Sequence, residues 1–224
     1  MTETEIRNAL INQLASSTSG ANAAFISEMF VDKFSRRADL VMANGKLAVF
    51  EIKSERDTLE RLKGQISSYI NFFEEVTVVC APRHQQNVDA IVPKNIGIWL
   101  IHSDGHLSVL RKAKKEQTLS IKNWLSFLPV DELKKLLKNK GLRASGNRTV
   151  LVEAACLLPI KSIRAYVLTF LKRRDERIDG LRSKKVEKQA YINENSIKSC
   201  SQKLHSYTES LSSSAMAIPR QVSH

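Results

Sequence analysis

The pattern of apolar and polar residues at the start of the chain is helical. Apolar side chains at Ile6, Leu10 and Leu14 recur four residues apart, which predicts a helix over residues 3–16. A loop rich in Ser, Gly, Ala and Asn follows. We expect a second, short helix over residues 27–34.

The pattern then changes to that of a β-hairpin. Residues 38–43 and 47–52 are two apolar runs, and Asn44-Gly45 lies between them. An Asn-Gly pair between apolar runs is the strongest short-range hairpin signal, because both residues tolerate a positive φ. The sequence therefore predicts two adjacent antiparallel strands here.

Helices and strands alternate through the rest of the first half of the chain. Helical spacing predicts helices over residues 57–73 and 84–91, and compact or alternating apolar runs predict strands over residues 76–81, 96–101 and 106–111. The resulting fold class is mixed α/β, with a sheet flanked by helices on both faces.

No strand pattern follows residue 117. Four apolar stripes predict helices over residues 121–128, 130–139, 148–158 and 160–174. A further helix near residues 184–192 is the last one that we expect.

The predicted organisation is therefore an α/β domain followed by a small all-helical segment and a tail. The domain covers residues 1–112 and the helical segment residues 117–178. We expect residues 179–224, which are polar with few apolar anchors, to be a largely disordered basic tail.

Positive charge is concentrated in the second of these parts. The 224 residues carry 35 Lys and Arg against 23 Asp and Glu, a formal net charge of +12. Residues 1–110 hold 11 basic and 13 acidic residues, residues 111–188 hold 21 and 8, and residues 189–224 hold 3 and 2. A basic block joined to a near-neutral one suggests a polyanionic partner, although solvated lysine-rich helix faces give the same count.

Other features favour a reduced, cytoplasmic protein. No apolar stretch is long enough to cross a bilayer, and the N-terminus lacks the layout of a secretory signal. Cys80, Cys156 and Cys200 are scattered and odd in number, which argues against a disulfide framework. No phosphate-binding glycine loop, nucleophile elbow or zinc-ligand spacing is present.

The predicted hairpin brings charged residues together. Asp39 begins one strand, and Glu51 and Lys53 end the other on a single face. Two converging carboxylates suit Mg²⁺ or Mn²⁺, and Lys53 could orient a metal-bound water. Glu28, on the helix expected over residues 27–34, is a further candidate ligand. The alternative is a salt-bridged surface hairpin.

These residues resemble the PD-(D/E)xK nuclease superfamily, as Asp39, Glu51 and Lys53 with Ala38 in place of the proline. Gln65 and Tyr69 follow at the spacing of the QxxxY element of RecB-type nucleases, although they could be plain packing residues. Two neighbouring runs, FEIKS and DTLERL, are similar to those of small bacterial and phage nuclease-like proteins.

That resemblance implies a restriction-endonuclease-like sheet and a Mg²⁺-dependent deoxyribonuclease. Asp39 and Glu51 would then bind the metal, Lys53 would assist the attacking water, and Gln65 and Tyr69 would steady Lys53 or the substrate. Arg36 and Arg37, beside Asp39, suit contacts with phosphate.

A second resemblance lies in the basic block. Residues 128–155 are similar to the SAP motif, a helix–loop–helix module that implies duplex DNA binding with weak sequence preference. The matching features are Gly141-Leu142, Ser145-Gly146 and the flanking helices. The candidate phosphate contacts are Lys134, Lys138, Lys140, Arg143 and Arg148. The alternative is an ordinary helical hairpin.

We therefore expect a nuclease that docks on duplex or branched DNA through this segment. Three other functions stay open: a nuclease-like fold that binds DNA in repair, recombination or phage–host conflict without cutting it, RNA cleavage, and a membrane-surface helix in the basic block.

Overall fold

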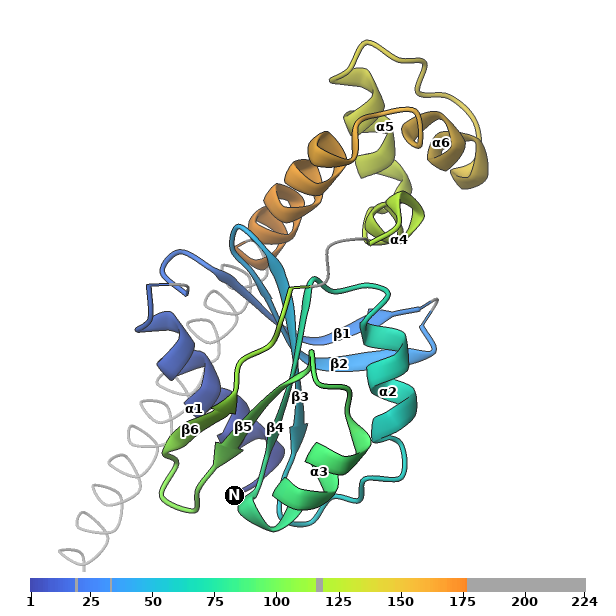
Figure 1. Ribbon diagram of the computed structural model, residues 1–224. Coiled ribbons are helices and arrows are strands. Elements are labelled where there is room, and N and C mark those ends of the chain that lie inside the picture. Colours follow the sequence, from blue (N-terminus) through green and yellow to red (C-terminus); the bar gives the residue numbers. More distant parts are fainter. Residues whose placement is uncertain (19, 33, 116–118, 177–224) are drawn as a thin grey trace, which may run out of the picture. The chain divides into compact units, whose positions relative to one another are not determined.

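The computed structural model describes residues 1–18, 20–32, 34–115 and 119–176. Within them, six strands form one mixed sheet whose spatial order follows the chain (Figure 1). The strands are β1 Ala24–Val31, β2 Arg36–Ala43, β3 Leu47–Lys53, β4 Glu75–Cys80, β5 Gly97–Ile101 and β6 Leu107–Arg111. The α/β prediction is confirmed at this level.

Strand directions follow from the lengths of the connections. β3, β4 and β5 are parallel and are joined through helices, whereas β1–β2, β2–β3 and β5–β6 are antiparallel pairs with short turns. The predicted hairpin is β2–β3, in register Leu40↔Phe50 to Ala43↔Leu47. Its turn contains Gly45 at a φ of +64°, a conformation that glycine adopts without a Cβ clash.

Helices cover both faces of the sheet. Helix α1, Glu3–Ala15, packs on one face through Ile6, Leu10 and Leu14. Helices α2, Leu62–Tyr69, and α3, Gln85–Ile91, lie on the other face (Figure 1). A single 3₁₀ turn, Pro82–His84, precedes α3. The charged side chains Glu51 and Lys53 of β3 are therefore shielded from water.

The prediction of a helix over residues 27–34 is wrong. Residues 27–31 are part of β1, which pairs antiparallel with β2, and Asp32 and Phe34 lie in the turn that follows. Ala24 and Ile26 are buried at alternate positions, but Glu28 has a φ of +56° and the buried positions resume at Met29 and Val31. The alternation of buried and exposed residues shifts by one position at Glu28, so the sequence does not keep the period of two that marks a strand. Apolar residues then recur three and four apart, which is the spacing of a helix.

The helix expected over residues 57–73 is shorter in the structure. Helix α2 begins at Leu62, and residues 55–61 form turns. Asp57 Oδ2 accepts hydrogen bonds from the backbone N–H and the hydroxyl group of Ser54, at 2.7 and 2.5 Å. These bonds hold the chain in a turn directly after β3 and so delay the helix.

The second half is helical, as predicted. Its helices are α4 Ile121–Ser126, α5 Val130–Lys138, α6 Arg148–Ala155 and a helix that covers residues 160–176. Their buried apolar side chains belong to the same core as α2 and α3. The predicted boundary between residues 112 and 117 falls between β6 and α4.

The helix expected near residues 184–192 and the tail from residue 179 lie outside the described residues. Among the helices that the structure describes, none has the length and apolar character needed to cross a membrane.

Candidate functional site

A buried ion pair lies at the end of β3. Glu51 and Lys53 are only 1% and 6% exposed, and Lys53 Nζ lies 2.7 Å from Glu51 Oε1. The two residues are two apart on one strand, which places both side chains on the face covered by α2. A buried charge needs a partner, and here each of the two provides one for the other.

Helix α2 supplies the other polar contacts of this pair. Gln65 Oε1 accepts a hydrogen bond from Lys53 Nζ at 3.2 Å, and the Tyr69 hydroxyl donates to Glu51 Oε2 at 2.9 Å. The i,i+4 spacing puts both side chains on the inner face of the helix. Burial, followed by the charge of Glu51, raises the pKa of Tyr69. Tyr69 is therefore a neutral donor at physiological pH.

Asp39 lies beside this group at the start of the hairpin. Its Oδ2 accepts a hydrogen bond from the backbone N–H of Ile52 at 2.7 Å. Burial, together with the negative charge of Glu51, raises the pKa of Asp39 to about 7. Burial also raises the pKa of Glu51, against the effect of its bonds with Lys53 and Tyr69. Two carboxylates thus share one poorly hydrated space.

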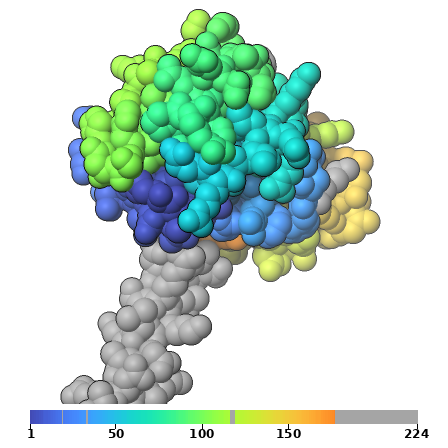
Figure 2. All heavy atoms as spheres, turned by 90° about the horizontal axis from the view of Figure 1, so that it is seen from below, coloured from blue at the N-terminus to red at the C-terminus, as the bar shows by residue number. Residues whose placement is uncertain are grey.

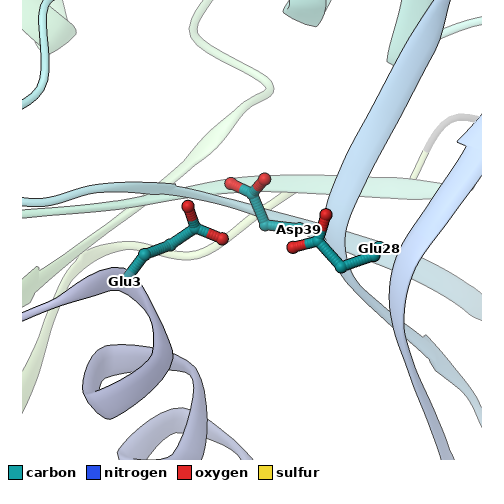
Figure 3. A group of neighbouring side chains, drawn as sticks. All are labelled: Glu3, Glu28 and Asp39. Carbon is teal, nitrogen blue, oxygen red and sulfur yellow. The ribbon is translucent and has the colours of Figure 1, made fainter.

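A second group of carboxylates meets at Asp39. Glu3, from the first turn of α1, and Glu28, from β1, place carboxylate oxygens within 4.8 Å of one another and of Asp39. All three point into one space (Figure 3). Arg7 pairs with Glu3 and with Glu28, the latter at 2.6 Å, and Arg37 Nε lies 2.5 Å from Glu28 Oε2. We call Glu3, Glu28 and Asp39 the carboxylate group.

The structure therefore brings the predicted site residues together in two adjoining sets. Glu51, Lys53, Gln65 and Tyr69 form one set, and the carboxylate group is the other. Asp39 belongs to the carboxylate group and is bonded to the backbone N–H of Ile52, which lies between Glu51 and Lys53. Glu28 comes from a strand rather than from the expected helix.

The prediction missed Glu3. Its place in the first turn of α1 is explained by helix capping, because Thr2 and Glu5 form a capping box there and acidic residues are favoured at a helix N-terminus. Nothing in the local sequence indicates the contact with β1 and β2.

The two arginines at the start of β2 differ in their surroundings. The Arg37 side chain is 58% exposed and pairs with Glu28. The Arg36 side chain lies near Gly64 of α2, and its buried Nε has no hydrogen-bond partner among the described residues. Of the two, Arg37 is the one placed to contact a ligand on the surface.

The basic helix–loop–helix consists of α5, a loop and α6. Gly141 ends α5 at a φ of +69°, and the N–H of Leu142 bonds to the carbonyl of Leu137 at 3.0 Å, a glycine C-cap. Asn147 is the N-cap of α6 and accepts a hydrogen bond from the N–H of Val150 at 3.1 Å. The loop is therefore anchored at both ends.

The cations of this segment fall into two kinds. Lys135 pairs with Glu132 at 2.6 Å. Lys138, Lys140 and Arg143 are exposed and Lys134 is half-buried, and no carboxylate of the described chain pairs with any of these four.

Arg148 has a different place from the one expected. Its guanidinium donates to the carbonyl oxygens of Leu128, Leu125 and Ser126 at 2.6, 3.3 and 3.4 Å. Its hydrogen-bond donors thus satisfy the free carbonyls at the end of α4, as basic residues often do at helix C-termini. Arg148 therefore supports the end of α4, and its contact with phosphate stays a prediction.

Fold and site together define a mixed α/β protein with a buried carboxylate–lysine cluster and a basic helix–loop–helix. The chain belongs to the bacteriophage P4 protein cII family, whose model matches residues 1–201. Protein cII of Enterobacteria phage P4 is 37% identical over 177 residues, which cover 77% of this chain and 67% of the relative. No solved structure matches the chain.

This family membership overturns the nuclease prediction. The chain is a member of the protein cII family and not of the PD-(D/E)xK superfamily, so the predicted deoxyribonuclease activity and the alternative of a silent nuclease fold in repair, recombination or phage–host conflict were both wrong. The motif misled because a hairpin places any Asp and Glu-x-Lys at this spacing on neighbouring strands. Here Lys53 and Tyr69 bind Glu51, and Glu3 and Glu28 surround Asp39.

Proposed function

We propose that the chain is a DNA-binding protein of the phage P4 cII family and that the loop between α5 and α6 contacts the phosphate backbone. The observation that carries this proposal is a run of basic side chains in which Lys138, Lys140 and Arg143 are exposed and pair with no carboxylate of the described residues. Residues 133–152 contain four lysines and two arginines and no Asp or Glu. Such a surface favours a polyanion over a neutral or acidic partner.

The packing of the segment supports the same role. Glu132 is buried and bonded to Lys135, Tyr166 and Arg173, so among the lysines of this stretch it pairs with Lys135 alone. Lys138, Lys140 and Arg143 follow one another along the end of α5 and the loop, and all three are exposed. The resemblance to the SAP motif concerns these same residues and implies weak sequence preference.

Salt-dependent DNA binding tests the proposal. In Lys138→Gln/Arg143→Gln we expect the affinity for a 20-base-pair duplex to fall about tenfold or more at 100 mM salt, equally for unrelated sequences. The slope of log K against log salt should also fall in magnitude by about two, because each lost phosphate contact contributes about one. Fluorescence anisotropy measures both quantities.

The matched control removes the same charge elsewhere. Lys63 and Lys94 are exposed lysines on α2 and after α3, and Lys63→Gln/Lys94→Gln should leave the slope unchanged. If both double variants weaken binding alike, the contact is a general effect of net charge and the assignment to the loop is wrong.

We further propose that the carboxylate group binds Mg²⁺ or Mn²⁺. Three oxygen donors from α1, β1 and β2 converge there, and hard cations prefer such donors. A bound cation would supply positive charge to Asp39 and Glu28, and Arg7 and Arg37 would hold Glu28 in place.

Thermal unfolding tests the cation site. We expect 5 mM MgCl₂ or MnCl₂ to raise the Tm of the parent chain and to leave that of Glu28→Gln/Asp39→Asn unchanged, because binding to the native state alone stabilises it. Glu60→Gln, which removes an exposed carboxylate after β3, should respond like the parent. An equal response of all three proteins would exclude a specific site.

A further inference from the structure

Two phenylalanine rings are exposed at the tip of the β1–β2 hairpin. Phe30 is 54% and Phe34 80% exposed, and their ring centroids lie 5.7 Å apart. Single exposed apolar residues are common, but two large rings in contact with each other and with solvent form a patch. Figure 2 shows the surface of the first strands, in mid-blue, beside that of α1, in dark blue.

The backbone holds these rings at the surface. Asp32 and Phe34 adopt φ values of +50° and +70°, and the N–H of Ser35 bonds to the carbonyl of Asp32 at 3.0 Å. The Ser68 hydroxyl of α2 donates to Asp32 Oδ2 at 3.2 Å. A non-glycine residue at positive φ costs free energy. The chain therefore accepts strain at Phe34 in a turn that leaves its ring in solvent.

An arginine lies beside the rings. Arg37 lies directly opposite Phe30 in the strand register, and its side chain is 58% exposed. Its Nε pairs with Glu28 Oε2 at 2.5 Å, and the guanidinium carries further N–H donors that can bind a phosphate. An apolar patch that binds another protein usually belongs to a much larger surface, of about 800 Å² on each partner. Two rings with arginine beside them match a nucleotide better, since it offers a flat base and a phosphate.

We propose that Phe30 and Phe34 stack on unpaired bases of DNA, with Arg37 on the adjacent phosphate. This inference rests on the proposed DNA-binding function and names its substrate class, which is DNA with a single-stranded region. Aromatic rings combined with basic side chains are the usual means of holding single strands, because every base has a face on which a ring can stack. The loop between α5 and α6 contacts the backbone, and the hairpin tip recognises the bases.

Comparison of single-stranded and duplex probes tests the inference on the full chain. With a fluorescein-labelled 20-nucleotide single strand, we expect Phe34→Ala to lower the affinity about fivefold or more, and Phe30→Ala/Phe34→Ala to lower it further. Binding of the same sequence as a blunt duplex should change less than twofold. Phe30→Leu/Phe34→Leu is the matched control, because it keeps apolar side chains at both positions and removes the rings.

A spectroscopic measurement separates stacking from simple contact. A single strand that carries 2-aminopurine should lose fluorescence on binding the parent, since stacking quenches this base, and should lose much less with the leucine variant. Circular dichroism and the Tm establish that each variant is folded, which is expected because both side chains are exposed.

The outcomes divide clearly. If the parent binds both probes and the phenylalanine variants bind like the parent, or lose both probes equally, the stacking role is wrong and the proposed function survives. If the leucine variant keeps both affinity and quenching, the contact is apolar and not aromatic, and stacking is again excluded. If the parent forms a dimer in sedimentation that Phe34→Ala dissociates, the rings bind a second copy of the chain and only the stacking role is wrong. If the parent binds neither probe, both proposals fail.

Discussion

Asp39 is the residue at which the two sets of polar side chains meet. It accepts a hydrogen bond from the backbone of Ile52, feels the charge of Glu51, and shares a space with Glu3 and Glu28. Burial, Glu51 and Glu3 oppose its ionisation, whereas the N–H group of Ile52 and the charge of Lys53 favour it. An aspartate in such a place is less stable as a carboxylate than it is in the unfolded chain.

The pH dependence of unfolding follows from this environment. The pKa of Asp39 is about 7 in the folded chain and 3.8 as a reference value. A carboxyl group whose pKa rises on folding makes its full contribution to the free energy of unfolding below about pH 4, where it is protonated in both states. That contribution is lost as the pH rises through 7, because the native state then has to release a proton that it binds tightly. Asp39→Asn keeps an oxygen that can accept the hydrogen bond from the Ile52 N–H and removes the titrating proton, so this variant should not lose stability as the pH rises.

We therefore expect Asp39→Asn to be more stable than the parent at pH 8 by about 1–4 kcal/mol, with a smaller difference at pH 5. Urea unfolding in the presence of EDTA at the two pH values measures the difference. Glu60→Gln removes an exposed carboxylate and should show little change between them. A difference for Asp39→Asn that is constant with pH would contradict the raised pKa.

At the scale of elements, β1 is the strand that the local sequence pattern failed to predict. The hairpin β2–β3, the strands β4 to β6 and the helices α1 and α3 to α6 were predicted within a few residues, because their apolar residues keep one period throughout. β1 was missed because Glu28 takes a left-handed φ within the strand and shifts the alternation. Only pairing with β2 shows that this segment is extended.

The same unusual strand carries much of the candidate function. Glu28 presents its carboxylate to Asp39, and Phe30 presents its ring at the hairpin tip. Local rules fail most often where a chain accepts strain for a purpose. β1, the strand that was predicted to be a helix, therefore contributes a residue to each proposed binding site: Glu28 to the cation site and Phe30 to the DNA-base site.

At the scale of the whole described chain, Glu74 joins the sheet to the helices that follow it. Its carboxylate is 4% exposed and accepts hydrogen bonds from the N–H of Leu47 at 2.9 Å and from Arg164 at 2.9 and 3.0 Å, and Lys115 lies 3.2 Å away. Burial alone would raise the pKa of Glu74, but the bonds from Arg164 and Leu47 outweigh it and lower the pKa. Glu74 is therefore ionised and fully bonded at neutral pH.

Loss of Glu74 should therefore destabilise the protein. We expect Glu74→Ala to reduce the free energy of unfolding by about 2–4 kcal/mol, because Leu47 and Arg164 lose a charged acceptor away from bulk water. Urea unfolding at pH 7 measures this change.

The neighbouring residue provides the control. Glu75 pairs with Lys46 at 2.6 Å nearer the surface, with exposed fractions of 20% and 31%, so Glu75→Ala should cost less than about 1 kcal/mol. Equal losses for the two variants would contradict a joining role for Glu74. A double-mutant cycle with Arg164→Met then isolates the coupling between the two segments.

The sequence by itself determined most of the elements, the mixed α/β class and the concentration of basic residues after the sheet, because these depend on local period and on composition. The site depended on contacts between distant residues. Asp39, Glu51 and Lys53 could be named from their spacing, and Gln65 and Tyr69 from a resemblance to a family motif. Only the tertiary structure joined Glu3 to Asp39, placed Arg148 at the end of α4 and left Phe30 and Phe34 in solvent. Spacing along a chain limits which side chains can meet, and packing alone decides which of them do.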